Sequence, residues 1–290
     1  MRPPYPLEGV ISWNMNTLCN YRCSYCTQRF LDDRKQWARD LPAFIEAFGR
    51  LPGDWELKLS GGEPFQHPGF LGAVRALAAA GRRISAVTNL SAAPDALAAF
   101  AEATAARPGL LSASLHLEYV EPAAFIEKLA TFQRLHQGGV VATVVASAAN
   151  LPRLEGLVAD FEAAGLTLKV QPEKHDRDVI AYTPEQRALL TRLGGHNRTG
   201  LVEPSFLGQP CWAGARYFIV DHRGEAWRCY PARRRRSERL GNLLHGDLRL
   251  DNAPRPCTYD YCNCTVPPER GMVLGGRERA AGGPSCSQER

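Results

Sequence analysis

The segment GVISWNMNTLCNYRCSYC, residues 9–26, joins a short apolar run to a loop with three closely spaced cysteines. Residues Gly9–Met15 have the length and apolar content of a buried β-strand. Cys19, Cys23 and Cys26 follow this strand within eight residues. The segment therefore predicts a strand whose carboxyl end presents three thiols.

Similar short strands, each apolar as if buried on both faces, alternate with segments of helical spacing up to about residue 173. This alternation predicts βα units on a parallel sheet, either an open doubly wound sheet or a partial barrel. The predicted strands are Gly9–Met15, Trp55–Leu59, Ile84–Thr88, Leu110–Leu115, Val140–Ala146 and Leu166–Gln171, and the predicted helices are Leu41–Leu51, Gly69–Ala80, Ala93–Ala105, Pro122–Leu135 and Pro152–Ala164.

Functional residues of such sheets gather at the carboxyl ends of the strands. This rule places the Cys19–Cys26 loop and the turn Ser60-Gly-Gly-Glu-Pro64 on the same rim. A Gly-Gly turn alone is weak evidence, because glycine there can simply satisfy a positive φ.

The number of thiols limits the kind of metal site. A structural zinc site takes four ligands, and a [4Fe–4S] cluster held only by protein takes four cysteines. Three cysteines in one loop suggest a cluster with one iron open to an external ligand, for which S-adenosylmethionine (SAM) offers an amino and a carboxylate group. A zinc knuckle, the alternative, lacks a fourth ligand nearby.

The CxxxCxxC pattern, with Tyr25 before its last cysteine, resembles the radical SAM superfamily. The resemblance implies that Cys19, Cys23 and Cys26 hold a [4Fe–4S] cluster. It also implies that SAM is cleaved reductively to a 5′-deoxyadenosyl radical, which takes a hydrogen atom from substrate. Because the family core is a partial (β/α)6 TIM-like barrel, the resemblance decides between the two α/β arrangements.

Residues on the predicted rim also resemble family motifs. Thr88-Asn89-Leu90 is similar to the family's TNG, with Leu90 replacing glycine, and Ser114-Leu-His116 is similar to S-L-D. His116 is a candidate catalytic residue or a buried structural histidine. The resemblance implies cofactor binding by Tyr25, Gly61, Gly62, Glu63, Pro64, Thr88, Asn89 and Ser114. Candidate catalytic residues are His116 and Glu118, and further candidate bases are Glu173, His175 and Arg216.

The alternation stops after Pro184–Leu193, a predicted helix, and Gly, Pro, Arg and Cys become frequent. Arg216–Val220, a turn and Glu225–Tyr230 predict a β-hairpin. We expect a core domain at residues 1–195, a small cysteine-rich domain at 196–266 and a flexible tail at 267–290.

The remaining six cysteines lie in the last third of the chain, and those that bracket the hairpin can converge with later ones on one metal. This arrangement resembles the twitch and SPASM extensions of radical SAM enzymes and implies one auxiliary [4Fe–4S] cluster. A zinc ribbon is the alternative. The expected ligands are Cys211, Cys229 and Cys257 with Cys262 or Cys264, whereas Cys286 is expected to be no ligand.

Composition limits the class of protein. The apolar fraction of 44 % and charged fraction of 22 % are typical of a folded globular protein. No apolar run of about 18 residues and no signal peptide is present, so we expect a cytoplasmic protein without membrane association. The run Arg233–Arg236 within a net charge of +5 is either a solvated loop or a patch that attracts an anionic substrate, a nucleotide or a redox partner. Nothing requires nucleic acid.

Three functional hypotheses follow. The first is oxidation or rearrangement of a small polar metabolite, resembling the twitch-bearing dehydrogenase of aminocyclitol biosynthesis. The second is modification of a ribosomally made peptide whose leader adds to a sheet edge. The third, from another class, is a non-catalytic Fe–S or zinc scaffold. An enzyme of this family implies an electron donor of the flavodoxin or ferredoxin type.

Overall fold

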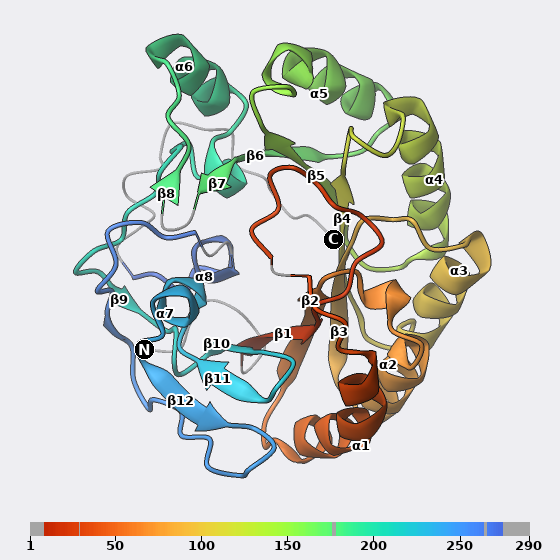
Figure 1. The fold of residues 1–290 in the computed structure, drawn as a ribbon, viewed down its shortest axis with the longest axis vertical. Coiled ribbons are helices and arrows are strands. Elements are labelled where there is room, and N and C mark those ends of the chain that lie inside the picture. The colour runs from red at the N-terminus through yellow and green to blue at the C-terminus, as the bar shows by residue number, and fades with distance from the viewer. Residues whose placement is uncertain (1–8, 29, 176–177, 264–265, 275–290) are drawn as a thin grey trace.

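The computed structural model describes residues 9–28, 30–175, 178–263 and 266–274. One nine-stranded sheet has the order β12-β11-β10-β1-β2-β3-β4-β5-β6. Its strands β1 to β6 are parallel and curve into a horseshoe that does not close (Figure 1). The predicted α/β fold with a partial six-stranded βα barrel is confirmed.

The strands of the barrel lie within a few residues of their predicted bounds. They are β1 (Gly9–Asn16), β2 (Trp55–Gly61), β3 (Arg83–Thr88), β4 (Pro108–Leu115), β5 (Val140–Ala146) and β6 (Leu168–Pro172). The helices are α1 (Arg34–Arg50), α2 (Phe70–Ala79), α3 (Pro94–Ala103), α4 (Pro122–Leu135), α5 (Leu154–Ala163) and α6 (Pro184–Arg192), with short 3-10 turns at Pro64–Gln66, Leu151–Arg153 and His196–Arg198.

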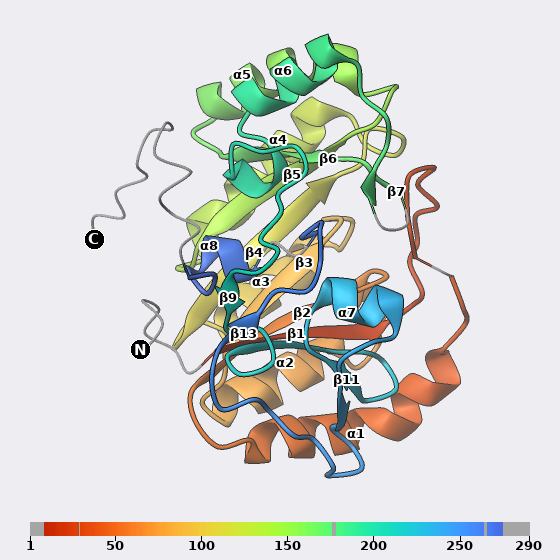
Figure 2. The ribbon, with the colours of Figure 1, turned by 90° about the vertical axis from the view of Figure 1, so that its left-hand side faces the viewer.

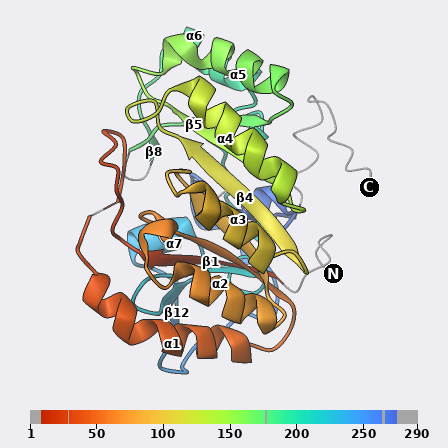
Figure 3. The same cartoon turned by 90° about the vertical axis from the view of Figure 1, so that its right-hand side faces the viewer.

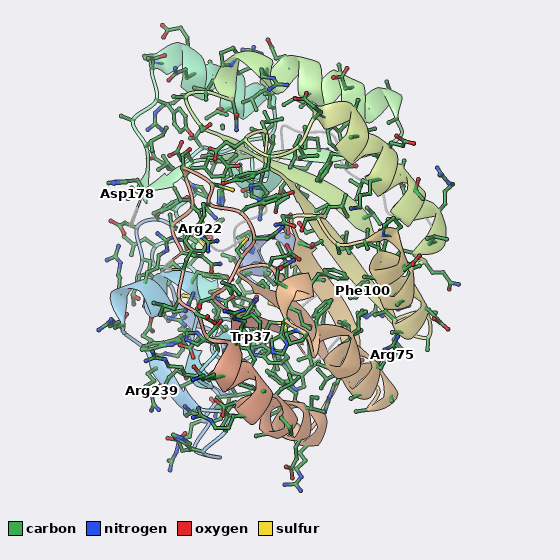
Figure 4. The ribbon with its side chains drawn as sticks, turned by 45° about the vertical axis from the view of Figure 1, so that its right-hand side comes forward. Arg22, Trp37, Arg75, Phe100, Asp178 and Arg239 are labelled. Carbon is green, nitrogen blue, oxygen red and sulfur yellow. The ribbon has the colours of Figure 1, made fainter. Side chains whose placement is uncertain are left out.

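Helices α1 to α4 lie side by side over the outer face of the sheet (Figure 3). Figure 4 marks three of their side chains: Trp37 of α1 and Phe100 of α3 are buried, and Arg75 of α2 is exposed. Trp37 stacks on His67 with ring centroids 4.5 Å apart. Among the helices that the structure describes, none combines the length and apolarity needed to span a membrane.

Each barrel strand has two chemically different faces. Ile11 and Leu57 are fully buried in the apolar core, whereas Ser12, Lys58 and Ser114 line a cavity on the opposite face. The expectation of strands that are apolar on both faces is therefore wrong for the inner face. Side chains alternate along a strand, so the lumen can be polar while the outer face packs against helices.

The predicted hairpin is confirmed as β10 (Tyr217–Val220) and β11 (Glu225–Trp227). β10 pairs in parallel with β1, with Val10 opposite Tyr217, so the hairpin extends the barrel sheet. Figure 2 shows β11, β13 and α7 close to β1. The other late elements are β7 (Lys174–His175), β8 (Asp178–Val179), β9 (Pro210–Cys211), α7 (Tyr230–Arg235), β12 (Arg239–Asn242), β13 (Arg255–Pro256) and α8 (Val266–Glu269).

Residues 266–274 are packed into the fold, which differs from the tail expected from residue 267. Met272 is fully buried, and its carbonyl accepts a hydrogen bond of 2.9 Å from the Trp212 N–H. Val273 forms a bridge with Cys211. Burial of these apolar side chains favours the ordered arrangement. The rest of the predicted tail, 275–290, lies outside the described residues.

The same segment joins two barrel strands near their amino ends. The Arg270 guanidinium donates to both carboxylate oxygens of Glu56 on β2, at 3.0 Å. Glu269 forms an ion pair with Lys169 on β6. Glu56 is 1 % exposed and also accepts a 2.6 Å hydrogen bond from Ser85. The segment therefore links β2 to β6 through charged side chains inside the barrel.

We expect Arg270→Met to lower the free energy of unfolding by about 3 kcal/mol, because it removes the guanidinium that pairs with the buried Glu56 carboxylate. Urea unfolding followed by circular dichroism measures this loss. Arg34→Met, which breaks an ion pair with more than half of each side chain exposed, is the control and should leave the stability unchanged. Equal effects of the two substitutions would contradict the prediction.

Candidate active site

A cavity of about 360 Å³ lies at the carboxyl ends of the barrel strands. The cysteine loop that follows β1 forms one wall, and Gly61 and Gly62 after β2 form another. Asn89, Ser114 and His116 face the same space from β3 and β4. The structure therefore brings together the main groups that the sequence predicted, on the rim where they were expected.

Backbone contacts fix the cysteine loop against the Gly-Gly turn. The Gly62 N–H donates to the Asn16 carbonyl, and the Glu63 N–H donates to the Leu18 carbonyl, both at 2.9 Å. The Asn16 side chain donates to the carbonyls of Leu18 and Glu63. A Cβ at position 62 would lie 2.0 Å from the Leu18 oxygen. Only glycine permits this approach.

Glu63 joins this turn to the end of β3. Its side chain is 1 % exposed and accepts hydrogen bonds from the Thr88 hydroxyl at 2.8 Å and the Asn89 N–H at 2.6 Å. Burial raises the pKa of Glu63, and these hydrogen bonds partly offset that increase. Glu63 and Pro64 do not line the cavity, whereas Gly61 and Gly62 do.

The segment after β3 contacts the cysteine loop. The Asn89 amide donates to Asn20 at 2.9 Å and lies 3.8 Å from the Cys19 sulfur. Leu90 has a φ of 61°, the left-handed conformation that favours glycine, and its side chain is 2 % exposed. Leu90 thus keeps a glycine-like backbone turn while it adds a side chain to the core.

The three thiols differ in exposure, since Cys23 is buried, Cys19 is half-buried and Cys26 is exposed. Burial raises the pKa of Cys19 and raises that of Cys23 to about 11. No set of three His, Cys, Asp or Glu side chains within the described ranges already surrounds a common metal position. Three thiols on one loop beside a cavity nevertheless fit the donor set of an iron–sulfur cluster, whose binding would release their protons.

His116 contacts the loop from the end of β4. Its Nδ1 lies 2.9 Å from the Tyr25 hydroxyl and 3.1 Å from the Cys23 sulfur. Burial lowers the pKa of His116 to about 4, so the imidazole is neutral at neutral pH. Burial also raises the pKa of the Tyr25 phenol. Of the two expected catalytic residues, His116 is the one that faces the cavity.

Glu118 lies outside the cavity lining, whereas a catalytic base would face the cavity. Its carboxylate accepts hydrogen bonds from the Ser24 N–H at 3.1 Å and the Ser24 hydroxyl at 2.5 Å, and it does not line the cavity. The neighbouring Tyr119 hydroxyl accepts from the N–H of Arg22, which Figure 4 marks on this loop. Tyr119 also stacks on Tyr21 at 4.2 Å. The segment after β4 therefore holds the cysteine loop in place.

The other candidate bases lie away from the cavity lining. Arg216 precedes β10 and its carbonyl pairs with Val10 at the start of β1, so it belongs to the opposite end of the barrel. Glu173 lies between β6 and β7, and His175 is the last residue of β7. Thr88 and Ser114 do line the cavity, and Ser114 accepts a 3.3 Å hydrogen bond from Thr143.

Several cavity residues were not found from the sequence. Lys58 shares the inner face of β2 with Glu56 and Ser60, and this alternation just before the Gly-Gly turn was the available signal. Lys174 and Arg234 come from elements that lie far away in the sequence. Arg234 donates to Thr27 of the cysteine loop at 2.8 Å, so the arginine run is more than a solvated loop.

The second set of cysteines gathers in one apolar cluster. Cys211 on β9, Cys229 before α7, and Cys262 are buried there, and Cys257 packs against the cluster. β9 pairs with β13, which brings Cys211 opposite Arg255. Cys264, the other candidate fourth ligand, and Cys286 lie outside the described residues.

Comparison with known proteins agrees with this geometry. Residues 13–153 match the family model described as Radical SAM superfamily. No curated protein matches the chain in sequence. The structure of SuiB from Streptococcus suis bound to the precursor peptide SuiA has a TM-score of 0.55 and 15 % identity, over 84 % of this chain and 63 % of that chain. A structure of anSMEcpe with bound AdoMet and the Cp18Cys peptide has a TM-score of 0.57 and 12 % identity, over 81 % of this chain and 77 % of that chain.

The chain thus spans less than two thirds of the length of SuiB. Likeness at such low identity concerns the fold alone. The family match covers the second half of β1, the cysteine loop and the strands β2 to β5. Residues 13–153, just under half of the chain, are therefore similar to the radical SAM superfamily.

Proposed function

We propose that this chain binds a [4Fe–4S] cluster through Cys19, Cys23 and Cys26 and binds SAM in the adjacent cavity. The observation that carries the proposal is that the three-thiol loop and the Gly61-Gly62 turn face each other across one cavity. When bound, the cluster supplies the electron that splits SAM and so starts hydrogen-atom abstraction from a substrate. The protein provides positioning and exclusion of water.

The rim residues have distinct tasks in this proposal. The Gly-Gly turn lets a ligand approach the backbone closely, and Asn89 and Ser114 offer polar groups from β3 and β4. Neutral His116 holds the Tyr25 hydroxyl beside the cluster loop. Glu63 orients this rim through the ends of β2 and β3 rather than through ligand contact.

The second proposed metal site is an auxiliary [4Fe–4S] cluster of the twitch type. Its ligands would be Cys211, Cys229 and Cys257, with Cys262 or Cys264 as the fourth. The grouping of four of these cysteines in one apolar cluster supports the site. A zinc ribbon uses the same donors, and metal analysis distinguishes the two.

For the net reaction, we propose oxidation of a small polar metabolite, in which the substrate would lose a hydrogen atom to the 5′-deoxyadenosyl radical, a proton to a base and its second electron to the auxiliary cluster. The cavity supports this proposal because about 360 Å³ is at the small end of ligand pockets and its lining includes polar side chains such as Ser12, Lys58 and Asn89. A flavodoxin or ferredoxin would supply the electron for SAM cleavage.

The alternative is modification of a ribosomally made peptide. The observation in its favour is that the barrel matches those of SuiB bound to precursor peptide SuiA and of anSMEcpe with bound peptide. The fold is therefore compatible with a peptide substrate. Binding of an extended peptide by the reconstituted protein would favour this alternative over the metabolite.

The first test is anaerobic reconstitution with iron and sulfide, followed by SAM and dithionite. We expect about eight irons per chain and formation of 5′-deoxyadenosine. The variant with Cys19, Cys23 and Cys26 all changed to Ala should keep about four irons and form no 5′-deoxyadenosine. Zinc in place of iron, or no SAM cleavage by fully loaded protein, would instead support a non-catalytic scaffold.

Gly62→Ala should abolish SAM binding, because its Cβ would meet the Leu18 carbonyl and separate the cysteine loop from the turn. Equilibrium dialysis with labelled SAM measures the loss. Gly72→Ala is the matched control, since position 72 lies on α2 with open space around its Cβ. Unchanged SAM affinity in Gly62→Ala would show that this contact does not shape the site.

Cys229→Ser should remove about four irons while the chain still forms 5′-deoxyadenosine, because Cys229 belongs to the second set and does not line the cavity. Iron analysis and Mössbauer spectroscopy measure the change. Thr258→Ser, an exposed position near Cys257, is the control. Retention of eight irons in Cys229→Ser would argue against its role as a ligand.

A further inference from the structure

Lys58 is a cation in the deep part of the cavity. It projects from the inner face of β2, and burial lowers the pKa of its ammonium. Within the described residues, its Nζ makes no hydrogen bond and no ion pair. The Lys58 side chain is half-buried, and a cation that gives up part of its hydration normally gains a partner in return. Lys58 is therefore unusual in the free protein.

The neighbouring charges do not compensate Lys58. The nearby carboxylates belong to Glu56 and Glu269. Glu56 is held by Arg270, and Glu269 is held by Lys169. This group of five thus contains three cations and two anions, and both anions have other partners. The surplus positive charge rests on Lys58, whose side chain faces the cavity.

The cavity wall adds to the positive charge. Lys174 and Arg234 line it from β7 and α7, and none of its described lining residues is an aspartate or a glutamate. Lys174 donates to the Asn263 carbonyl at 3.2 Å, and Arg234 donates to Thr27. Low-dielectric walls of one sign concentrate the field and attract a ligand of opposite charge.

We propose that Lys58 is a substrate-binding residue that pairs with an anionic group of the substrate, a carboxylate or a phosphate, in the deep part of the cavity. The inference deepens the proposed function, because it takes SAM to occupy the rim above Lys58. On β2, Lys58 lies two positions before Ser60 on the same face, away from the Gly-Gly turn. The substrate anion would complete the charge pairing that the protein alone leaves open.

The test uses the full chain, reconstituted with iron and sulfide and saturated with SAM. Isothermal titration calorimetry with glutarate, inorganic phosphate and neutral glutaramide compares wild type with Lys58→Met. Lys35→Met, on the exposed surface of α1, is the control for loss of one positive charge. We expect glutarate or phosphate to bind wild type and Lys35→Met at least tenfold more tightly than Lys58→Met, and glutaramide not to bind.

The preferred anion distinguishes a carboxylate substrate from a phosphorylated one. Equal affinity of Lys58→Met and wild type, binding of glutaramide as tight as that of glutarate, or no binding of either anion would overturn the proposal. SAM affinity measured in the same samples reports on the proposed function separately. We expect Lys58→Met to keep the SAM affinity of wild type, and a tenfold loss would assign Lys58 to SAM instead.

A second measurement needs no ligand. Thermal unfolding of Lys58→Met should show a midpoint equal to or above that of wild type, because the substitution replaces a half-buried cation that has no ion-pair partner with an apolar side chain of similar length. A clearly lower midpoint would show that Lys58 already has a stabilising partner in the free protein. That result would overturn the proposal.

Discussion

The close approach of Gly62 to the Leu18 carbonyl is the contact on which the rest of the site depends. It joins the loop after β1 to the turn after β2, so two segments that are distant in the sequence are held in contact. Glu63 then connects this junction to β3, and Glu118 connects the cysteine loop to β4. Four strand ends are thus fixed relative to one another before any ligand binds. Preorganised sites of this kind lose little free energy to ordering when they bind.

The inner face of the barrel carries polar side chains, which can bind a ligand in the cavity. The outer face of the sheet packs against the helices in the apolar core, where Leu57 of β2 and Phe100 of α3 are fully buried. The inner face can then carry serines and charged side chains, provided that the buried charges are paired. The segment 266–274 meets this condition for Glu56 and Lys169 by contributing Arg270 and Glu269. A segment that composition suggested to be a tail is thus part of the barrel interior.

Local patterns made much of the fold predictable, and long-range contacts account for the rest. Strand and helix periodicity located β1 to β6 and the hairpin, but α1 begins at Arg34 rather than Leu41, since Pro42 is tolerated inside the helix. Gly138 lies between the end of α4 at Leu135 and the start of β5 at Val140. It has no positive φ, and a Cβ there would lie 2.1 Å from the Gly109 carbonyl, so its requirement is steric. The pairing of Arg270 with a strand 214 residues away has no local signal.

The short helix α7 connects the second set of cysteines to the cavity that the cysteine loop lines. Cys229 precedes its first residue, and Arg234, near its last, lines the cavity and touches Thr27 of the cysteine loop. Five residues of helix span about 8 Å. Tyr230, at the start of the helix, also lines the cavity and donates to Asn14 of β1. A substrate in the cavity would therefore lie between the cysteine loop and the Cys229 end of α7, as the proposed loss of two electrons to different sites requires.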